Sequence, residues 1–120
     1  MKILQNDRIK AKEITAFNSR NLLMNRIIIS YDEIHIGCMF IGADGIVGYH
    51  QATTEQLFLI VEGEGWVKGE DGEEIFVTAG FAALWDAGEW HESKSEKGMT
   101  AIVIEGKNLK HYLPEYGGVL

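Results

Sequence analysis

The fold is decided by residues 48–63, which read GYHQATTEQLFLIVEG. Successive side chains of a strand point to opposite faces. One face of this stretch carries Gln56, Phe58 and Ile60, and the other carries Leu57, Leu59 and Val61. Because both faces are mostly apolar, the strand should be buried on both sides, with one face lining a barrel lumen and the other meeting a second sheet or a second subunit. We therefore expect a homodimer.

Short β-rich runs separated by glycine turns extend in both directions from this stretch. Glycine accounts for 14 of the 120 residues, which exceeds the usual share of about 7%. Turns such as Asp71-Gly72 favour tight hairpins because glycine accepts a positive φ. The pattern predicts an all-β, single-domain barrel or sandwich of eight strands. The predicted strands are residues 26–31, 34–41, 46–50, 56–62, 65–68, 74–78, 82–85 and 99–105.

Charge divides the chain into an arm, a barrel and a tail, which we place at residues 1–26, 27–105 and 106–120. The arm has six basic and two acidic residues (+4), and the remainder has five and sixteen (−11), which together give −7. No Lys or Arg lies between Arg26 and Lys68, so the barrel would repel a phosphate backbone, and nucleic-acid binding is excluded. The arm is either a solvated tail or docks on an acidic surface such as a second copy, as part of a dimer interface. Residues 14–24 carry a partial helical pattern.

The chain has few signals for targeting. Its apolar runs are far shorter than the roughly 20 residues that cross a bilayer, and polar residues interrupt the first eight positions where a secretory signal would be apolar. The single cysteine, Cys38, has no partner in the chain for a disulfide. These features predict a cytoplasmic protein that does not insert into membranes, with Cys38 as a small buried core residue.

Two spaced motifs carry the chemistry. In the first, His50 precedes Gln56 by six residues and Gly63 by thirteen, and in the second, Gly80 precedes Gly88 and His91. Together they resemble the two motifs of the cupin family, in which His-x-His, Glu and Gly are followed by Gly, Pro-x-Gly, His and Asn. The Pro and Asn of the second motif are replaced here. The resemblance covers residues 27–105 and implies a double-stranded β-helix, or jelly-roll barrel.

The resemblance also implies which residues face the lumen. In the family, three histidines and one glutamate hold a divalent iron, manganese, nickel, copper or zinc ion. Here the second histidine position is Ala52 and the glutamate position is Gln56. The remaining candidate metal ligands are His50, Gln56 and His91, a weak set because each lost imidazole or carboxylate removes binding energy.

Three functions are compatible with these residues. The favoured one is a small-molecule-binding barrel, in which His50, Gln56 and His91 form hydrogen bonds and aromatic side chains line the pocket. Because Lys and Arg are missing from the barrel's first half, the ligand should be neutral, and aromatic or weakly polar. The alternative is an enzyme, either a metal-dependent oxygenase or a metal-free isomerase or lyase with His50 or His91 as acid or base. The third is a structural barrel with a filled lumen. The expected aromatic ligand contacts are Phe58, Trp85 and Trp90.

Overall fold

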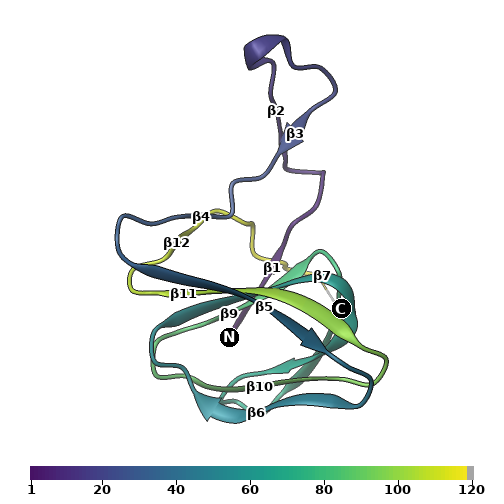
Figure 1. Cartoon of the computed structure of the whole chain (residues 1–120), viewed down its shortest axis with the longest axis vertical. Helices are drawn as coiled ribbons and strands as arrows, with labels where there is room; N and C mark the ends of the chain where they lie inside the picture. The colour runs from purple at the N-terminus through teal and green to yellow at the C-terminus, as the bar shows by residue number, and fades with distance from the viewer. Residues whose placement is uncertain (119–120) are drawn as a thin grey trace.

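The chain folds almost entirely into antiparallel strands, as predicted (Figure 1). The computed structural model describes residues 1–118, and within them the one helical element is a short 3-10 turn, η1 (Ala16–Asn18). The strands are β1 (Lys2–Gln5), β2 (Lys12–Glu13), β3 (Leu23–Met24), β4 (Ile28–Ile29), β5 (Ile34–Ile41), β6 (Gly45–Gln51), β7 (Glu55–Lys68), β8 (Glu74–Thr78), β9 (Phe81–Trp85), β10 (Trp90–Ser95), β11 (Met99–Gly106) and β12 (Lys110–His111).

Strand β7 belongs to both main sheets. Its first half pairs with β9 and β11, and its second half pairs with β8 and β10. A β-bulge at Val61 separates the halves, because Thr100 of β11 pairs with Glu62 whereas Ala101 pairs with Ile60. A bulge bends a strand and increases its twist, which lets β7 leave one sheet and enter the other. The predicted strands 56–62 and 65–68 are therefore one strand.

Gly63 makes this passage possible. Its φ is +82°, and a Cβ at this position would collide with the carbonyl oxygen of Gly98. Only glycine accepts that combination of positive φ and close backbone approach without strain. The glycine that ends the first motif is thus a structural requirement of the strand crossing.

The two sheets form a barrel that is not closed. One sheet has the order β5-β11-β7-β9-β1, and the other contains β8, β7, β10 and β6. Strands β5 and β6 lie at the free edges and form no ladder with each other within residues 1–118. The jelly-roll architecture is as expected, with an open seam between β5 and β6.

The predicted two-sided burial of β7 is confirmed. Phe58 and Ile60 belong to the core between the sheets, whereas Leu57 and Leu59 belong to a second core on the outer face. The second core is completed by Leu4 and by two residues of the C-terminal tail, Leu109 and Leu113. The outer face of β7 is thus covered at these positions by the chain itself rather than by a second subunit.

Four local expectations need correction. Residues 2–5 of the predicted arm form β1, which pairs with β9, so the free arm is residues 6–26. Strand β10 was missed because its inward side chains are polar. The helical pattern at 14–24 yields only η1 and β3. Cys38 is exposed rather than buried, because the outer face of edge strand β5 has no layer over it.

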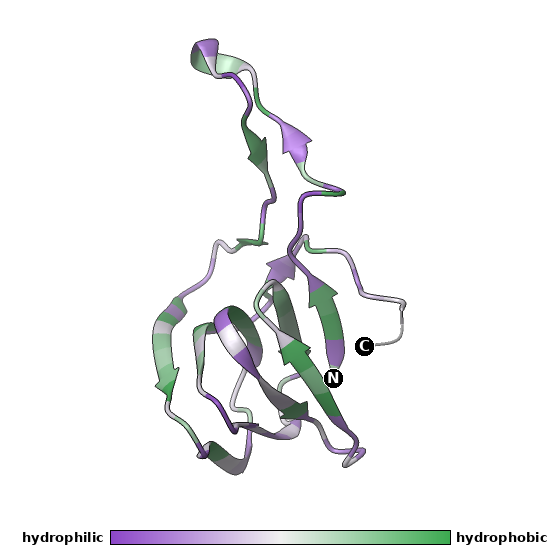
Figure 2. Cartoon of the chain, turned by 90° about the vertical axis from the view of Figure 1, so that its right-hand side faces the viewer, coloured by the Kyte–Doolittle hydropathy of each residue, from purple (hydrophilic) through white to green (hydrophobic). Residues whose placement is uncertain are grey.

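The free arm projects far from the barrel (Figures 1 and 2). Its only ladder is the short pairing of β2 with β3, and its base is held by Asn25, whose side-chain amide donates hydrogen bonds to Asn6 and Asp7. No helix in residues 1–118 is long and apolar enough to span a membrane.

Candidate functional site

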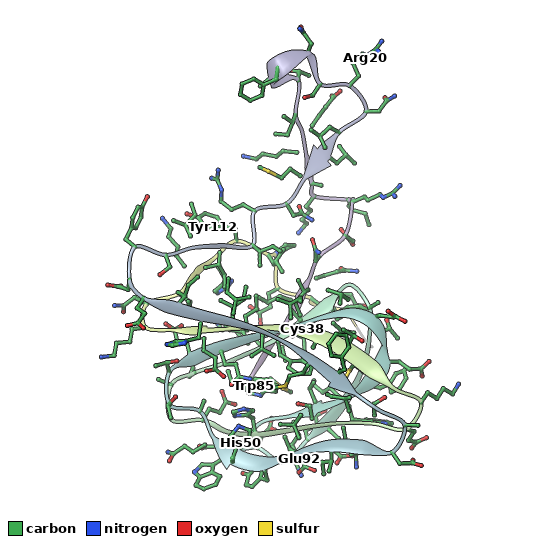
Figure 3. All side chains as sticks on the ribbon, viewed as in Figure 1. Arg20, Cys38, His50, Trp85, Glu92 and Tyr112 are labelled. Carbon is green, nitrogen blue, oxygen red and sulfur yellow. The ribbon has the colours of Figure 1, made fainter. Side chains whose placement is uncertain are left out.

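The two motif histidines meet across a strand pair. His50 on β6 and His91 on β10 are register partners, and their ring centroids lie 4.4 Å apart at an interplanar angle of 56°. His91 is buried, whereas His50 is exposed because β6 is an edge strand at the open seam. The structure therefore buries one imidazole and exposes the other, His50, which is labelled in Figure 3.

Backbone carbonyl groups orient both rings. Nδ1 of His50 lies 2.6 Å from the carbonyl oxygen of Gly48, and Nδ1 of His91 lies 3.1 Å from that of Glu89. A carbonyl oxygen only accepts, so each Nδ1 carries a proton and donates it. In a neutral ring, Nε2 is then the unprotonated nitrogen. The lone pair of His91 Nε2 is buried and has no partner within residues 1–118.

The surroundings keep His91 neutral. Burial lowers the pKa of its imidazole below the usual value of 6.5, and the nearby His50 lowers it further. The hydrogen bond to the Glu89 carbonyl group and the charges of Glu89 and Glu105 raise the pKa, but they do not outweigh burial. At neutral pH His91 therefore presents an uncharged acceptor nitrogen.

Trp85 fills the barrel beside His91. Their rings stack with centroids 4.3 Å apart at 26°, and Phe58 packs edge-on against Trp85 with centroids 5.8 Å apart. All three side chains are fully buried. The indole Nε1–H of Trp85 is also buried without a partner in the described residues. An unpaired donor and an unpaired acceptor thus belong to two rings in direct contact.

Gln56 and Glu105 lie in the same row of side chains as Trp85. Trp85 pairs with Gln56, Gln56 with Glu105, and Glu105 with His35, across strands β9, β7, β11 and β5. Cross-strand partners lie on the same face of a sheet, so this row faces the barrel interior. Gln56 is buried and Glu105 is half-buried. Neither motif contains Glu105, and only the register of β11 against β7 brings it to the site.

An open cavity of about 500 Å³ adjoins this row. Its walls include Glu105 and His35 together with Thr53 and Thr54, which connect β6 to β7. Sequence reasoning assigned no site role to these residues. The cavity therefore lies at the end of the sheet where Gln56 sits, next to the filled region around Trp85.

Trp90 is not part of this cluster. Because His91 points inward, its neighbour Trp90 points outward, where it is exposed and lies against Tyr49 with ring centroids 5.5 Å apart. Of the expected ligand contacts, the structure groups His50, His91, Trp85 and Phe58 through ring contacts, adds Gln56 through its pairing with Trp85, and separates Trp90.

The donor set does not fit a resident metal ion. No group of three or more His, Cys, Asp or Glu side chains in residues 1–118 lies close enough together to hold one. Two carboxylates close to the motifs in sequence have other partners: Glu55 accepts a hydrogen bond from the backbone N–H of Leu109, and Glu89 binds the N-terminal ammonium of Met1 at 2.7 Å. Gln56 would add only a neutral amide oxygen to the two imidazoles, so the set lacks the third histidine, cysteine or carboxylate ligand usual for catalytic zinc.

Comparison with known proteins agrees with this architecture. A family model described as "Cupin domain" matches residues 39–107. A cupin superfamily protein from Desulfitobacterium hafniense is 15% identical with a TM-score of 0.59, and the match covers 88% of this chain and 98% of that one.

Two similar structures come from proteins named for different reactions. A DMSP lyase from Ruegeria pomeroyi is 18% identical with a TM-score of 0.59, over 64% of this chain and 40% of that one. A predicted oxalate decarboxylase from Thermotoga maritima is 22% identical with a TM-score of 0.54, over 57% and 62%. This chain thus spans less than two thirds of either protein, and at these identities the likeness extends to the fold alone. No curated protein matches the sequence. The matched family model, the jelly-roll sheets and the paired motif histidines together show that the chain belongs to the cupin family.

Proposed function

We propose that the chain binds a small, neutral, hydroxyl-bearing molecule, aromatic or weakly polar, inside the barrel where His91 stacks on Trp85. The observation that supports this proposal is the pair of buried, unpartnered atoms, His91 Nε2 and Trp85 Nε1. Each polar group left unpaired in a protein interior costs about 1–3 kcal/mol. A ligand that pairs with both atoms recovers that energy on binding.

The chemistry of the two atoms selects the ligand group. His91 Nε2 needs a donor and Trp85 Nε1–H needs an acceptor. A hydroxyl group satisfies both, whereas a carboxylate only accepts and an ammonium group only donates. The lack of Lys and Arg between residues 27 and 67 also disfavours an anionic ligand. The open cavity beside Glu105 and His35 adjoins the row of side chains that contains Trp85, and it offers the nearest opening to this region.

Phenol is a suitable probe because it combines a neutral aromatic ring with one hydroxyl group. We expect saturable changes in the NMR signal of the Trp85 indole N–H, with a free energy of binding of about 4 kcal/mol, typical of a fragment of this size. Anisole lacks the hydroxyl proton and benzoate is charged, so both should bind at least about 10-fold more weakly. Changing His91 to Phe should reduce phenol binding to the level of anisole.

Two results would contradict the proposal. The first is equal binding of phenol and benzoate, or no saturable binding of phenol. The second is a stoichiometric, tight complex with manganese, iron, nickel, copper or zinc that is lost in both His50→Gln and His91→Gln. That second result would show that the barrel holds a metal ion despite the incomplete ligand set, and it would favour the metal-dependent alternative over the proposed one. Calorimetric titration of the metal-free chain with each ion measures whether such a metal complex forms.

A further inference from the structure

A groove lined almost entirely by isoleucine lies between β4 and the outer face of the β5–β11 pair. Its volume is about 590 Å³, and it is lined by Asn25, Ser30 and the six isoleucines at positions 27–29, 34, 36 and 104. None of these residues is charged or aromatic. We name this feature the isoleucine groove.

The strand pairings explain how the groove forms. Ile36 of β5 is the register partner of Ile104 of β11, so both lie on the outer face of that sheet, where Ile104 is buried and Ile36 is 64% exposed. Strand β4, which pairs with β12, supplies the other wall (Figure 1). The volume is within the range of about 300–1,000 Å³ found for small-ligand pockets. The groove therefore has room for one small molecule, and its contacts are mainly aliphatic.

Two cationic side chains flank the groove. Arg26 lies in the chain between Asn25 and Ile27, both of which are wall residues, and Lys110 is the register partner of the wall residue Ile29. Both cations lie over the ring of Tyr112, which is labelled in Figure 3. The distances to the ring centre are 5.8 Å for the Arg26 guanidinium carbon and 5.5 Å for the Lys110 ammonium nitrogen. The ring thus gathers two positive charges beside the groove.

These two cations lack acidic partners. Within residues 1–118, neither forms an ion pair or a side-chain hydrogen bond, whereas Lys68 and Lys94 each bind a glutamate at 3.0 Å. Like charges gathered at one ring repel each other, and an anionic group between them removes that repulsion. A carboxylate also accepts charge-assisted hydrogen bonds from both side chains. An aliphatic groove flanked by unpaired cations is thus complementary to an amphiphile with an anionic head.

We propose that the isoleucine groove binds a free fatty acid of medium chain length. Its alkyl chain lies against the isoleucines, and its carboxylate lies between Arg26 and Lys110. Asp32 and Glu33 follow the groove wall at Ser30, so the carboxylate is repelled from that end of the wall. Residues 27–120 hold five basic and sixteen acidic residues, which opposes contact with an anionic membrane, so the ligand is a single molecule taken from solution.

This site is separate from the barrel interior. The groove is on the outer face of the β5–β11 pair, whereas His91 and Trp85 are buried on the inner side of the sheets. A fatty acid in the groove and a hydroxyl-bearing molecule beside His91 do not compete, and either proposal can fail without the other.

Calorimetric titration of the full chain with decanoate, below its micelle-forming concentration, tests the alkyl contact. One molecule should bind per chain. Octanoate is shorter by two CH₂ groups and should bind up to about 15-fold more weakly, because each fully buried CH₂ group is worth about 4-fold. Ile36→Asp should weaken decanoate binding by about 10-fold or more, since it places a carboxylate in the groove wall. Ile46→Asp adds the same charge on β6, at a side chain that is 61% exposed, and should leave binding unchanged.

A charge series tests the position of the carboxylate. Decyltrimethylammonium has the same alkyl length and the opposite charge, and it should bind at least about 10-fold more weakly than decanoate. The double variant Arg26→Gln/Lys110→Gln should weaken decanoate binding by about 5-fold, as expected for exposed charges. The control Lys10→Gln/Lys12→Gln removes the same charge from exposed positions on the arm and should have no effect. Because Arg26 and Lys110 are also exposed, this comparison remains valid if Ile36→Asp does not fold by circular dichroism.

Several results would overturn the proposal. One is the absence of saturable decanoate binding, and another is equal binding of decanoate and decyltrimethylammonium. A third is decanoate binding that neither Ile36→Asp nor Arg26→Gln/Lys110→Gln weakens. Two other occupants of the groove are tested with the same variants. A dimer in sedimentation equilibrium that Ile36→Asp dissociates and decanoate does not would assign the groove to a second copy. Binding to phosphatidylglycerol vesicles that Ile36→Asp abolishes would assign it to a membrane surface.

Discussion

Replacing Trp85 by phenylalanine tests whether its indole N–H is unpaired in the folded chain. The Trp85 side chain has 0% exposure, and Nε1 has no partner in residues 1–118. Phenylalanine keeps a ring for stacking on His91 and for the edge contact with Phe58, while it removes the N–H group. Two opposing contributions to the free energy of unfolding follow.

The loss comes from apolar burial and packing. Phenylalanine buries about 40 Å² less surface, which at about 25 cal/mol per Å² costs about 1 kcal/mol. The space left by the smaller ring costs up to about 1 kcal/mol more, depending on how far its neighbours relax. The gain comes from removing an unpaired buried donor, which stabilises the folded chain by about 1–3 kcal/mol. We therefore expect the free energy of unfolding of Trp85→Phe to lie between about 1 kcal/mol below and about 2 kcal/mol above that of the wild type.

Urea denaturation followed by circular dichroism measures this difference. Trp85→Ala is the comparison, and it should lose about 3–5 kcal/mol because the whole ring disappears. A loss above about 2 kcal/mol for Trp85→Phe would show that Nε1–H is paired in the protein and would refute the reasoning behind the proposed ligand site. In that case Trp85 Nε1–H would not be free to pair with a ligand, and it could not act with His91 Nε2 to select a hydroxyl group.

Three further predictions concern the same barrel. The free energy of unfolding should fall as the pH drops below about 6.5, because the unfolded chain then binds a proton at His91 that the folded chain, with its lowered pKa, resists. His91→Gln should remove this part of the fall. Urea titrations at several pH values that show the same dependence of unfolding free energy on pH for both proteins would contradict this prediction. Glu105→Gln should lower the pKa of His91 further, because the carboxylate raises it; an unchanged pKa by NMR titration would place Glu105 outside the site. Ser95→Ala should cost about 2–4 kcal/mol in urea unfolding, because its buried hydroxyl donates to a backbone carbonyl at 2.6 Å and accepts from a backbone N–H at 2.8 Å; the matched buried serine variant, Ser93→Ala, should cost less than about 1 kcal/mol, and similar losses for the two would refute this role.

Local patterns located the strands well where apolar side chains alternate. Residues 34–41 and 74–78 match the bounds of β5 and β8, and both runs are set off by turn residues. Strand β10 escaped detection because its inward positions are His91, Ser93 and Ser95, which look like loop residues in sequence. Their burial depends on β6 and β7 pairing on either side, a non-local condition.

The site was predictable in part. The motif spacing pointed to His50, Gln56 and His91, and simple alternation next to His91 would have excluded Trp90. No local signal marks Glu105, because its place beside Gln56 depends on the register between β11 and β7, strands about 40 residues apart in the chain.

By itself, the amino-acid sequence determined the all-β class, the glycine-bounded strands and the spacing of the two histidines, because side-chain alternation and backbone φ preferences act between neighbouring residues. Only the tertiary structure decided which surfaces are covered. It placed the C-terminal tail over β7, left β5 and Cys38 exposed, and left the ring nitrogens of His91 and Trp85 without partners. Coverage and register are set by contacts between distant strands, and these contacts exist only after the barrel has formed.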